Sequence, residues 1–180
     1  MAQLPAETQV GANTFGCVIN NQVFYPRDGR YGGFPSGSIH KAITFWDSGI
    51  YTSWVWNEIE VGNYNNSKPI SSMIVHLQNL NTIGVGNYLW GIATFQNSID
   101  GPMYNYLYCS VFNSTTNTYD NYGSYDNSGK VTITRYDLPN RIVSGTFSGM
   151  LKIQNGTQLL EIQNGRFDLK WSTLDSTPFP

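Results

Sequence analysis

The sequence predicts an all-β fold: an antiparallel two-sheet β-sandwich of about ten strands, with a lipocalin-like closed barrel as the alternative. Apolar and polar residues alternate from Gly129 to Trp171 with the period of a half-buried strand. Turn-forming pairs such as Asn155-Gly156 interrupt the apolar runs. Similar short runs recur upstream, separated by Gly, Pro and Asn. Together these patterns indicate antiparallel strands joined by short turns.

The clearest pattern is a C-terminal meander over residues 130–171. Its expected breaks lie at Asp137 to Asn140, Asn155-Gly156 and Asn164-Gly165, all of which are turn formers. In the last strand, three apolar side chains should point inward and the three charged ones outward: Phe167, Leu169 and Trp171, and Arg166, Asp168 and Lys170. Each apolar group contributes roughly 1.5–3 kcal/mol when buried, so the register is strongly specified.

The N-terminal part predicts a lead-in, a hairpin and a loop. Residues 1–12 are polar and should be extended, ahead of a single all-β domain over residues 13–175. Thr14 to Tyr25 predicts a hairpin that turns at Asn20-Asn21. Pro26 to Ser38 is rich in Gly and Pro and predicts a long loop, a kind of segment that often carries function.

The middle of the chain predicts further strands, which are Ile39 to Trp46, Ile50 to Val61, Ser71 to Leu80, Tyr88 to Phe95 and Met103 to Asn113. Turns or polar loops should separate them, at Asp47-Ser48-Gly49, Gly62 to Pro69 and Asn97 to Pro102. A short helix is the alternative for Ser71 to Leu80, although the strand-rich context favours a strand. Residues 114–129 predict a polar loop or a short irregular hairpin.

Composition narrows the class of protein. The 180 residues suffice for one domain with a sizeable core. Charged residues make up 12%, about half the usual share, while 14% are aromatic. This balance is typical of secreted β-proteins, whose solvent faces are polar rather than ionic. The net charge of −2 provides no broad basic field for nucleic acid, and no apolar run is long enough for a transmembrane helix.

The two cysteines and the first residues leave alternatives open. Cys17 and Cys109 are consistent either with one disulfide or with two buried thiols that act as small hydrophobes. Residues 1–7 lack the basic and apolar regions of a signal peptide. The protein is therefore either cytosolic or exported by a segment that has been removed before Met1. The composition favours export.

Several short motifs of the sequence occur together in a known family. They are NTFGC within Leu4 to Asn20, the segment Ser71 to Leu89, SGTF within Ile133 to Phe147, and NGRFD over Asn164 to Asp168. With them the chain resembles uncharacterised secreted lipoproteins of Bacteroidetes, a family defined by a domain of unknown function. The resemblance implies export to the periplasm or the outer-membrane and cell surface, with membrane contact only through an N-terminal lipid. Cys17 lies within NTFGC, so the lipidated cysteine would precede this chain. The family has no established activity, so the resemblance implies none for this chain.

Common catalytic and metal-binding signatures are absent from the sequence. It contains no phosphate-binding loop, dinucleotide fingerprint, GxSxG elbow or HExxH motif, and its cysteines and histidines lack zinc spacing. His40 and His76 are expected to be ordinary strand histidines, and Glu58 and Glu60 to share a solvated strand face. The Asn- and Asp-rich stretch 117–129 reads as Asx turns rather than a calcium site. We expect no catalytic residues, no metal and no cofactor.

Aromatic side chains are the strongest functional lead. Candidate ligand-binding residues are Trp54 and Trp56 on one strand, the row Tyr104, Tyr106 and Tyr108, and the loop residues Tyr119, Tyr122 and Tyr125. Such side chains stack on sugars or anchor protein partners, but they also pack β-cores. We expect a non-catalytic envelope domain that binds glycan, an envelope protein or another extracellular ligand. The alternatives are a carrier of a small apolar ligand and a structural or interaction module. An enzyme would require His40 or His76 to meet a carboxylate or serine in one cleft.

Overall fold

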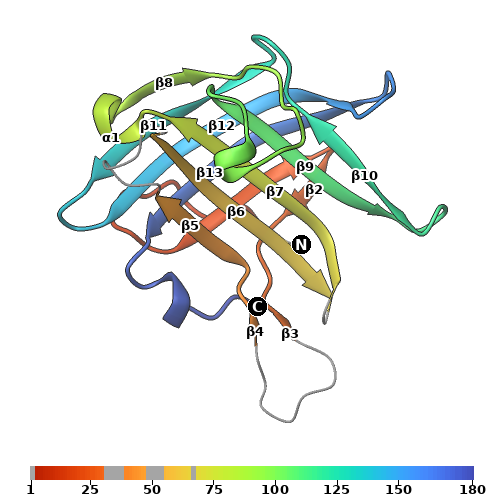
Figure 1. The fold of residues 1–180 in the computed structure, drawn as a ribbon. Coiled ribbons are helices and arrows are strands. Elements are labelled where there is room, and N and C mark those ends of the chain that lie inside the picture. Colours follow the sequence, from red (N-terminus) through yellow and green to blue (C-terminus); the bar gives the residue numbers. More distant parts are fainter. Residues whose placement is uncertain (1–2, 31–38, 48–54, 66–67) are drawn as a thin grey trace.

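A computed structural model describes residues 3–30, 39–47, 55–65 and 68–180 (Figure 1). The described residues are 56% strand and 6% helix, so the predicted all-β class is confirmed. The strands are β1 (Thr14–Ile19), β2 (Gln22–Phe24), β3 (Gly29–Arg30), β4 (Ile39–His40), β5 (Ile43–Asp47), β6 (Trp56–Asn65), β7 (Lys68–Gln78), β8 (Gly86–Leu89), β9 (Tyr106–Asn113), β10 (Thr118–Gly123), β11 (Gly129–Asp137), β12 (Ile142–Ile153) and β13 (Leu159–Lys170). The short helices are α1 (Leu80–Ile83), η1 (Ser98–Asp100) and η2 (Leu174–Ser176).

One large antiparallel sheet branches at β12. The order is β2-β1-β13-β12-β10-β9-β7-β6-β5, and β11 and β8 extend from the same β12. One edge of β12 pairs with β13, while its other edge pairs first with β11 and then, at Lys152 and Ile153, with β10. In Figure 1 the β5–β10 branch passes in front of β12, β13 and β1. No described strand joins β5 to β2, so the closed barrel is wrong for this part of the chain.

The core lies between the two branches. Ile59, Val75 and Leu107 of the front branch belong to one buried cluster with Phe167 and Leu169 of β13. Successive side chains of a strand point to opposite faces, so the residues between these core positions project away from the core. This alternation decides which polar side chains reach the outer face.

Several predicted elements are confirmed. The hairpin β1–β2 pairs as expected, and the Asn residues at its turn both have positive φ. Ser71 to Leu80 is a strand rather than a helix, since β7 runs to Gln78 before the single turn of α1. The C-terminal meander is present as β11, β12 and β13. Three predictions fall partly or wholly outside the described residues. They are the loop Pro26 to Ser38, the turn after Asp47 and the start of the strand from Ile50.

Other boundaries were wrong. The predicted loop Gly62 to Pro69 is mostly strand, because β6 pairs with β7 out to Asn65 and Lys68. The strand predicted to reach Phe95 ends at Leu89, after which the Trp90 indole is buried and donates to the Ser148 carbonyl at 2.9 Å. The segment 114–129, predicted as a polar loop or a short irregular hairpin, contains the regular strand β10, which pairs antiparallel with β9.

The predicted turn at Asn164-Gly165 is instead a bulge inside β13. Asn164 has φ of 53°, and the β12–β13 register shifts between Phe147 and Gly149. Asn adopts this left-handed conformation more readily than most residues, so it accommodates the extra residue without ending the strand.

Both cysteines are buried free thiols. Burial raises the pKa of Cys109 to about 12, and burial followed by the proximity of Cys109 raises that of Cys17. We expect neither thiol to react with a water-soluble disulfide reagent in the native protein, and both to react in guanidinium, because the thiolate is the nucleophile. Thiol titration under both conditions tests this. Rapid labelling of the native protein, or the absence of thiols after denaturation, would contradict it.

None of the helices in the described residues is long and apolar enough to cross a membrane.

Candidate functional site

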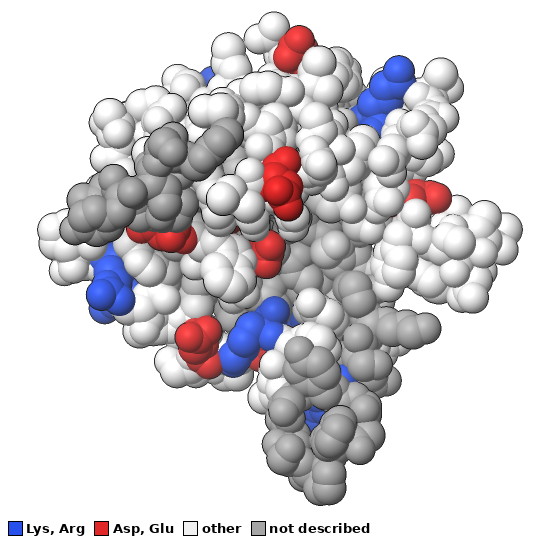
Figure 2. Space-filling view, viewed as in Figure 1, with Lys and Arg blue, Asp and Glu red and all other residues white. Residues whose placement is uncertain are grey.

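The outer face of β5, β6 and β7 carries a set of polar and aromatic side chains. Ile43, Ile59 and Val75 point into the core, so their neighbours in sequence project outward. Cross-strand pairing then aligns two rows of side chains on this face. One row is Thr44, Glu60 and Ile74, and the other is Trp46, Glu58 and His76. Figure 2 shows charged side chains standing singly or in small groups among uncharged atoms on the side viewed in Figure 1.

A pocket of about 370 Å³ opens on this face. We call it the outer-face pocket, and its principal lining residues are His40, Thr44, Glu60, Tyr64, Ser72 and Ile74. The Tyr64 ring lies over Gly62, where a Cβ atom would come within 2.3 Å of its Cε2. The His40 ring stacks against Tyr64, with centroids 5.3 Å apart and planes 10° from parallel. The pocket therefore combines an aromatic wall with polar groups.

Glu60 has an unusual electrostatic setting in this pocket. Burial raises the pKa of its carboxyl and the nearby charge of Glu58 raises it further, while a hydrogen bond from the Trp46 side chain acts in the opposite direction. Lys41 also lines the pocket, and its ammonium lies 3.8 Å from the Asp28 carboxylate. Glu60 is thus a carboxyl group suited to hydrogen bonding with a neutral polar ligand.

Glu58 lies on the same strand face but is fully buried. Its carboxylate accepts hydrogen bonds from His76 Nδ1 (2.6 Å), the Ser98 amide (2.7 Å) and hydroxyl (3.2 Å), and the Tyr106 hydroxyl (3.1 Å). We call these four residues the Glu58 cluster. Burial alone would raise the pKa of Glu58, but the hydrogen bonds, led by that of His76, bring it below its ordinary value.

The Glu58 cluster is satisfied internally. The Gln78 amide nitrogen lies 2.8 Å from His76 Nε2, which places the imidazole proton on Nδ1. Ser98 belongs to η1, so the carboxylate holds the 91–105 segment on the sheet. The expectation that Glu58 shares a solvated face with Glu60 is therefore wrong, because that segment covers Glu58. His76 is a buried strand histidine with partners on both ring nitrogens.

The aromatic candidates do not form one surface. Trp54 lies outside the described residues, whereas the Trp56 ring stacks on His76 (5.9 Å), which stacks in turn on Tyr106 (4.4 Å). Tyr106 is buried, Tyr108 is half-buried beside it on the outer face, and Tyr104 precedes the strand.

The three tyrosines that were predicted to share one loop also lie in different environments. Tyr119 and Tyr122 lie on β10, where Tyr119 is exposed and Tyr122 is buried in the core. Tyr125 is exposed in the connection to β11. The described residues contain no group of three or more His, Cys, Asp and Glu side chains that would hold a metal ion.

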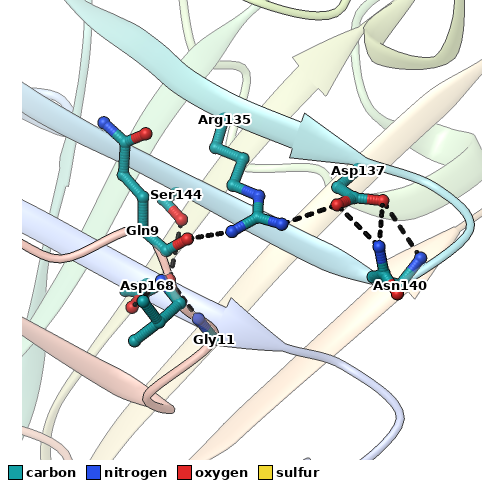
Figure 3. Close-up of polar contacts among 8 residues, drawn as sticks. Gln9, Gly11, Arg135, Asp137, Asn140, Ser144 and Asp168 are labelled. Atoms are coloured by element: carbon teal, nitrogen blue, oxygen red, sulfur yellow. Dashed lines mark hydrogen bonds and ion pairs between the residues drawn. The ribbon is translucent and has the colours of Figure 1, made fainter.

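Asp168 is a second buried carboxylate, on β13 (Figure 3). Its five donors are the Thr8 hydroxyl (2.6 Å), the Val10, Gly11 and Ala12 amides (3.0, 2.8 and 3.1 Å) and the Ser144 hydroxyl (2.7 Å). The predicted solvent exposure of Asp168 is wrong, because the N-terminal lead-in packs over it. Burial opposes ionisation, but the hydrogen bonds outweigh it and lower the pKa. Arg135 also donates to the Gln9 carbonyl, and these contacts hold the lead-in in place.

Sequence reasoning missed most of the outer-face pocket. Tyr64 falls within the predicted Asn-rich loop Gly62 to Pro69, although the alternation Trp56, Glu58, Glu60 continues to Tyr64 through Gly62. Thr44 and Ser72 carry no signal of their own, since they become pocket residues only through the pairing of β5, β6 and β7.

No family model matches the chain, and comparison with curated proteins and with solved structures found no significant match. The resemblance to Bacteroidetes lipoproteins therefore stays an expectation.

Proposed function

We propose that this chain is a non-catalytic carbohydrate-binding domain and that the outer-face pocket holds one sugar residue of a glycan. The observation that carries the proposal is the stacked His40–Tyr64 pair beside Glu60 in one pocket. An aromatic wall packs against the C–H face of a sugar, and carboxyl and hydroxyl groups hydrogen-bond its hydroxyls. The hydroxyls of Thr44 and Ser72 supply further partners in the same pocket.

Binding is favoured over hydrolysis by the state of the second carboxylate. The pocket does bring His40, Glu60 and Ser72 into one cleft. A glycosidase needs two carboxyl groups facing the substrate, however, and Glu58 is buried with its oxygens occupied by the Glu58 cluster. Glu60 is then a ligand-binding group rather than one member of a catalytic pair.

We further propose that the domain is exported and lipid-anchored at the cell envelope, as the family resemblance implies. The low charge content supports this, since 12% charged residues suits a polar rather than ionic surface. The finer architecture in this proposal is a two-sheet sandwich, with the β5–β10 branch as one sheet and β8, β11–β13, β1 and β2 as the other. Their shared core cluster supports this division.

A second candidate is a carrier of a small apolar ligand. A pocket of about 510 Å³ is lined by aromatic and proline side chains that include Phe15, Tyr25, Pro26 and Phe179. Such a lining favours an apolar molecule over a sugar. Fluorescence of an apolar dye distinguishes the two candidates. A carrier should bind the dye in this pocket and increase its fluorescence, whereas a glycan-binding domain does not need to bind it.

Tyr64→Ala should weaken glycan binding at least tenfold, because the variant loses the aromatic wall; tenfold corresponds to about 1.4 kcal/mol. A glycan array first identifies the ligand, and calorimetry then measures the Kd of the wild type and the variants. Tyr64→Phe should retain binding because its ring is kept. Tyr125→Ala is the matched control, as Tyr125 is exposed and lies outside the pocket. Unchanged affinity in a folded Tyr64→Ala protein, or a wild type that retains no glycan, would exclude the proposal.

A further inference from the structure

A pocket of about 700 Å³ opens on the outer face of the sheet, at the place where β10 pairs with β12. Three segments line it, which are residues 92–95, 123–125 and 152–157. We call it the Lys152 pocket. It shares no lining residue with the outer-face pocket, so what it binds does not depend on the glycan proposal.

Lys152 lies on the pocket side of β12 because of the alternation of that strand. Leu151 is fully buried in the core, so Lys152 projects to the outer face. Its cross-strand partner is Gly123 of β10, which has no side chain to fill the space beside it. Glu161 stands diagonally across the ladder, opposite Met150, but within the described part of the chain Lys152 forms no ion pair. Since none of the lining residues is acidic, the pocket offers one uncompensated positive charge.

The rest of the Lys152 pocket is largely apolar, and Phe95 is its central group. Phe95 has φ of 64°, a left-handed conformation that is unfavourable for a bulky residue and persists only where its neighbours enforce it. Its ring packs on Gly123, where a Cβ atom would come within 3.2 Å of Cζ, and edge-on against Tyr108, with centroids 5.6 Å apart. Ile92 and Tyr125 also line the pocket and are 49% and 38% exposed. Apolar surface is therefore open to solvent beside the ammonium group.

Hydrogen bonds hold the segments around the Lys152 pocket in place. The Ala93 amide donates to the Ser124 carbonyl at 2.9 Å, and the Ser124 hydroxyl donates to the Gly91 carbonyl at 2.8 Å. On the β12 side, the Gln154 amide donates to the Asn121 carbonyl at 2.8 Å. Both walls are thus fastened to β10 or to the residue that follows it. A preformed pocket spares a ligand the entropic cost of ordering these segments.

We propose that the Lys152 pocket binds a small organic anion with an apolar body. The anionic group pairs with the Lys152 ammonium, and the apolar body packs against Phe95 and Ile92. The apolar body displaces water from around the ammonium, and a charge pair is stronger where the local dielectric is lower. A purely apolar molecule would instead desolvate the ammonium without giving it a partner, which costs free energy. The ligand class therefore differs from those of the outer-face pocket and of the pocket around Phe15.

Fluorescence titration of the full chain with anilinonaphthalene sulfonate, an aromatic organic anion, tests the role of the charge. The Kd of this dye should rise about fivefold or more in Lys152→Gln, because the variant loses the charge-assisted contact. Lys130→Gln is the matched control, since Lys130 is an exposed lysine of β11 outside the pocket and its replacement should leave the Kd unchanged. Phenylnaphthylamine has the same rings without the sulfonate, so Lys152→Gln should not alter its binding. A wild type that does not bind the anion, an unchanged Kd in Lys152→Gln, or an equal loss for both dyes overturns the proposal.

A second pair of variants tests whether the apolar body lies in the Lys152 pocket. Ile92→Ser should raise the Kd of the anionic dye about threefold or more, because it removes apolar contact area. Ile99→Ser is the matched control, since Ile99 is 62% exposed in η1 and does not line the pocket. Both isoleucines are exposed, so neither substitution should unfold the protein, and circular dichroism checks this. Equal Kd values for the two variants would place the dye elsewhere and overturn the proposal.

Discussion

Asp168→Ala should lower the free energy of unfolding by about 3–4 kcal/mol. The wild-type carboxylate satisfies five donors, and three of them are consecutive backbone amides of the lead-in, at Val10, Gly11 and Ala12. Alanine leaves these donors without an acceptor beneath the covering segment. Hydrogen bonds to a charged group contribute about 1.5–3 kcal/mol each in isolation, but they do not add in a shared network.

Urea unfolding monitored by tryptophan fluorescence measures the effect. Asp168→Asn keeps the shape of the side chain but turns an NH₂ group toward the donors, so it should be nearly as destabilising. Glu161→Gln is the matched control on the same strand, because Glu161 is exposed and its replacement should change stability by less than about 0.5 kcal/mol. Equal midpoints for Asp168→Asn and Glu161→Gln would refute the role assigned to Asp168.

Acid should remove the contribution of Asp168. Its pKa is lowered in the folded protein, so the unfolded chain binds the proton more readily. The stabilisation is therefore present above the ordinary Asp pKa of about 3.9 and is lost as the pH falls through the lower native pKa. The difference in stability between the wild type and Asp168→Asn should be constant near neutral pH and shrink in that acidic range.

His76→Ala should be destabilising by about 3–5 kcal/mol, the second large effect. The variant removes the donor at 2.6 Å from a fully buried carboxylate and leaves a cavity between Trp56 and Tyr106. Tyr106→Phe provides a graded comparison, because it removes one hydroxyl donor and keeps the ring. We expect it to lower stability by about 1 kcal/mol.

Two measurements separate the loss of the hydrogen bond to the buried carboxylate from the loss of side-chain volume. The double variant Glu58→Gln/His76→Ala should be less destabilised than the sum of the single variants, since no charge is left unpaired. Hydrogen exchange at the Ser98 amide, which donates to Glu58 at 2.7 Å, should accelerate in Glu58→Gln. Additive effects together with unchanged Ser98 exchange would show that the buried carboxylate does not hold the 91–105 segment.

The sequence predicted the fold best where local pattern and tertiary environment agree. β11, β12 and β13 alternate cleanly, and Phe167 and Leu169 are buried as the alternation requires. Prediction failed where a residue type has two structural uses. Asn164-Gly165 has the composition of a turn, but pairing with β12 on one side and β1 on the other keeps it within a strand as a bulge.

The candidate site was only partly predictable, because burial depends on segments distant in sequence. The alternation of β6 correctly placed Glu58 and Glu60 on one face. It contains no information that residues 91–105 would cover Glu58 and leave Glu60 in a pocket. The prediction that Asp168 is exposed fails for the same reason, since Thr8 of the lead-in that covers it is 160 residues away in the chain.

The branching of the sheet at β12 makes the two halves of the molecule mutually dependent. β12 is the only described strand that pairs with β10, β11 and β13, so it connects the front branch to the rest. An insertion at the exposed Asn155-Gly156 turn leaves these pairings intact, whereas a break within β12 disrupts the strand that joins three parts of the large sheet: the β5–β10 branch, β11 with β8, and β13 with β1 and β2. Circular permutants and split fragments of this protein should therefore be opened at that turn, with β12 kept whole.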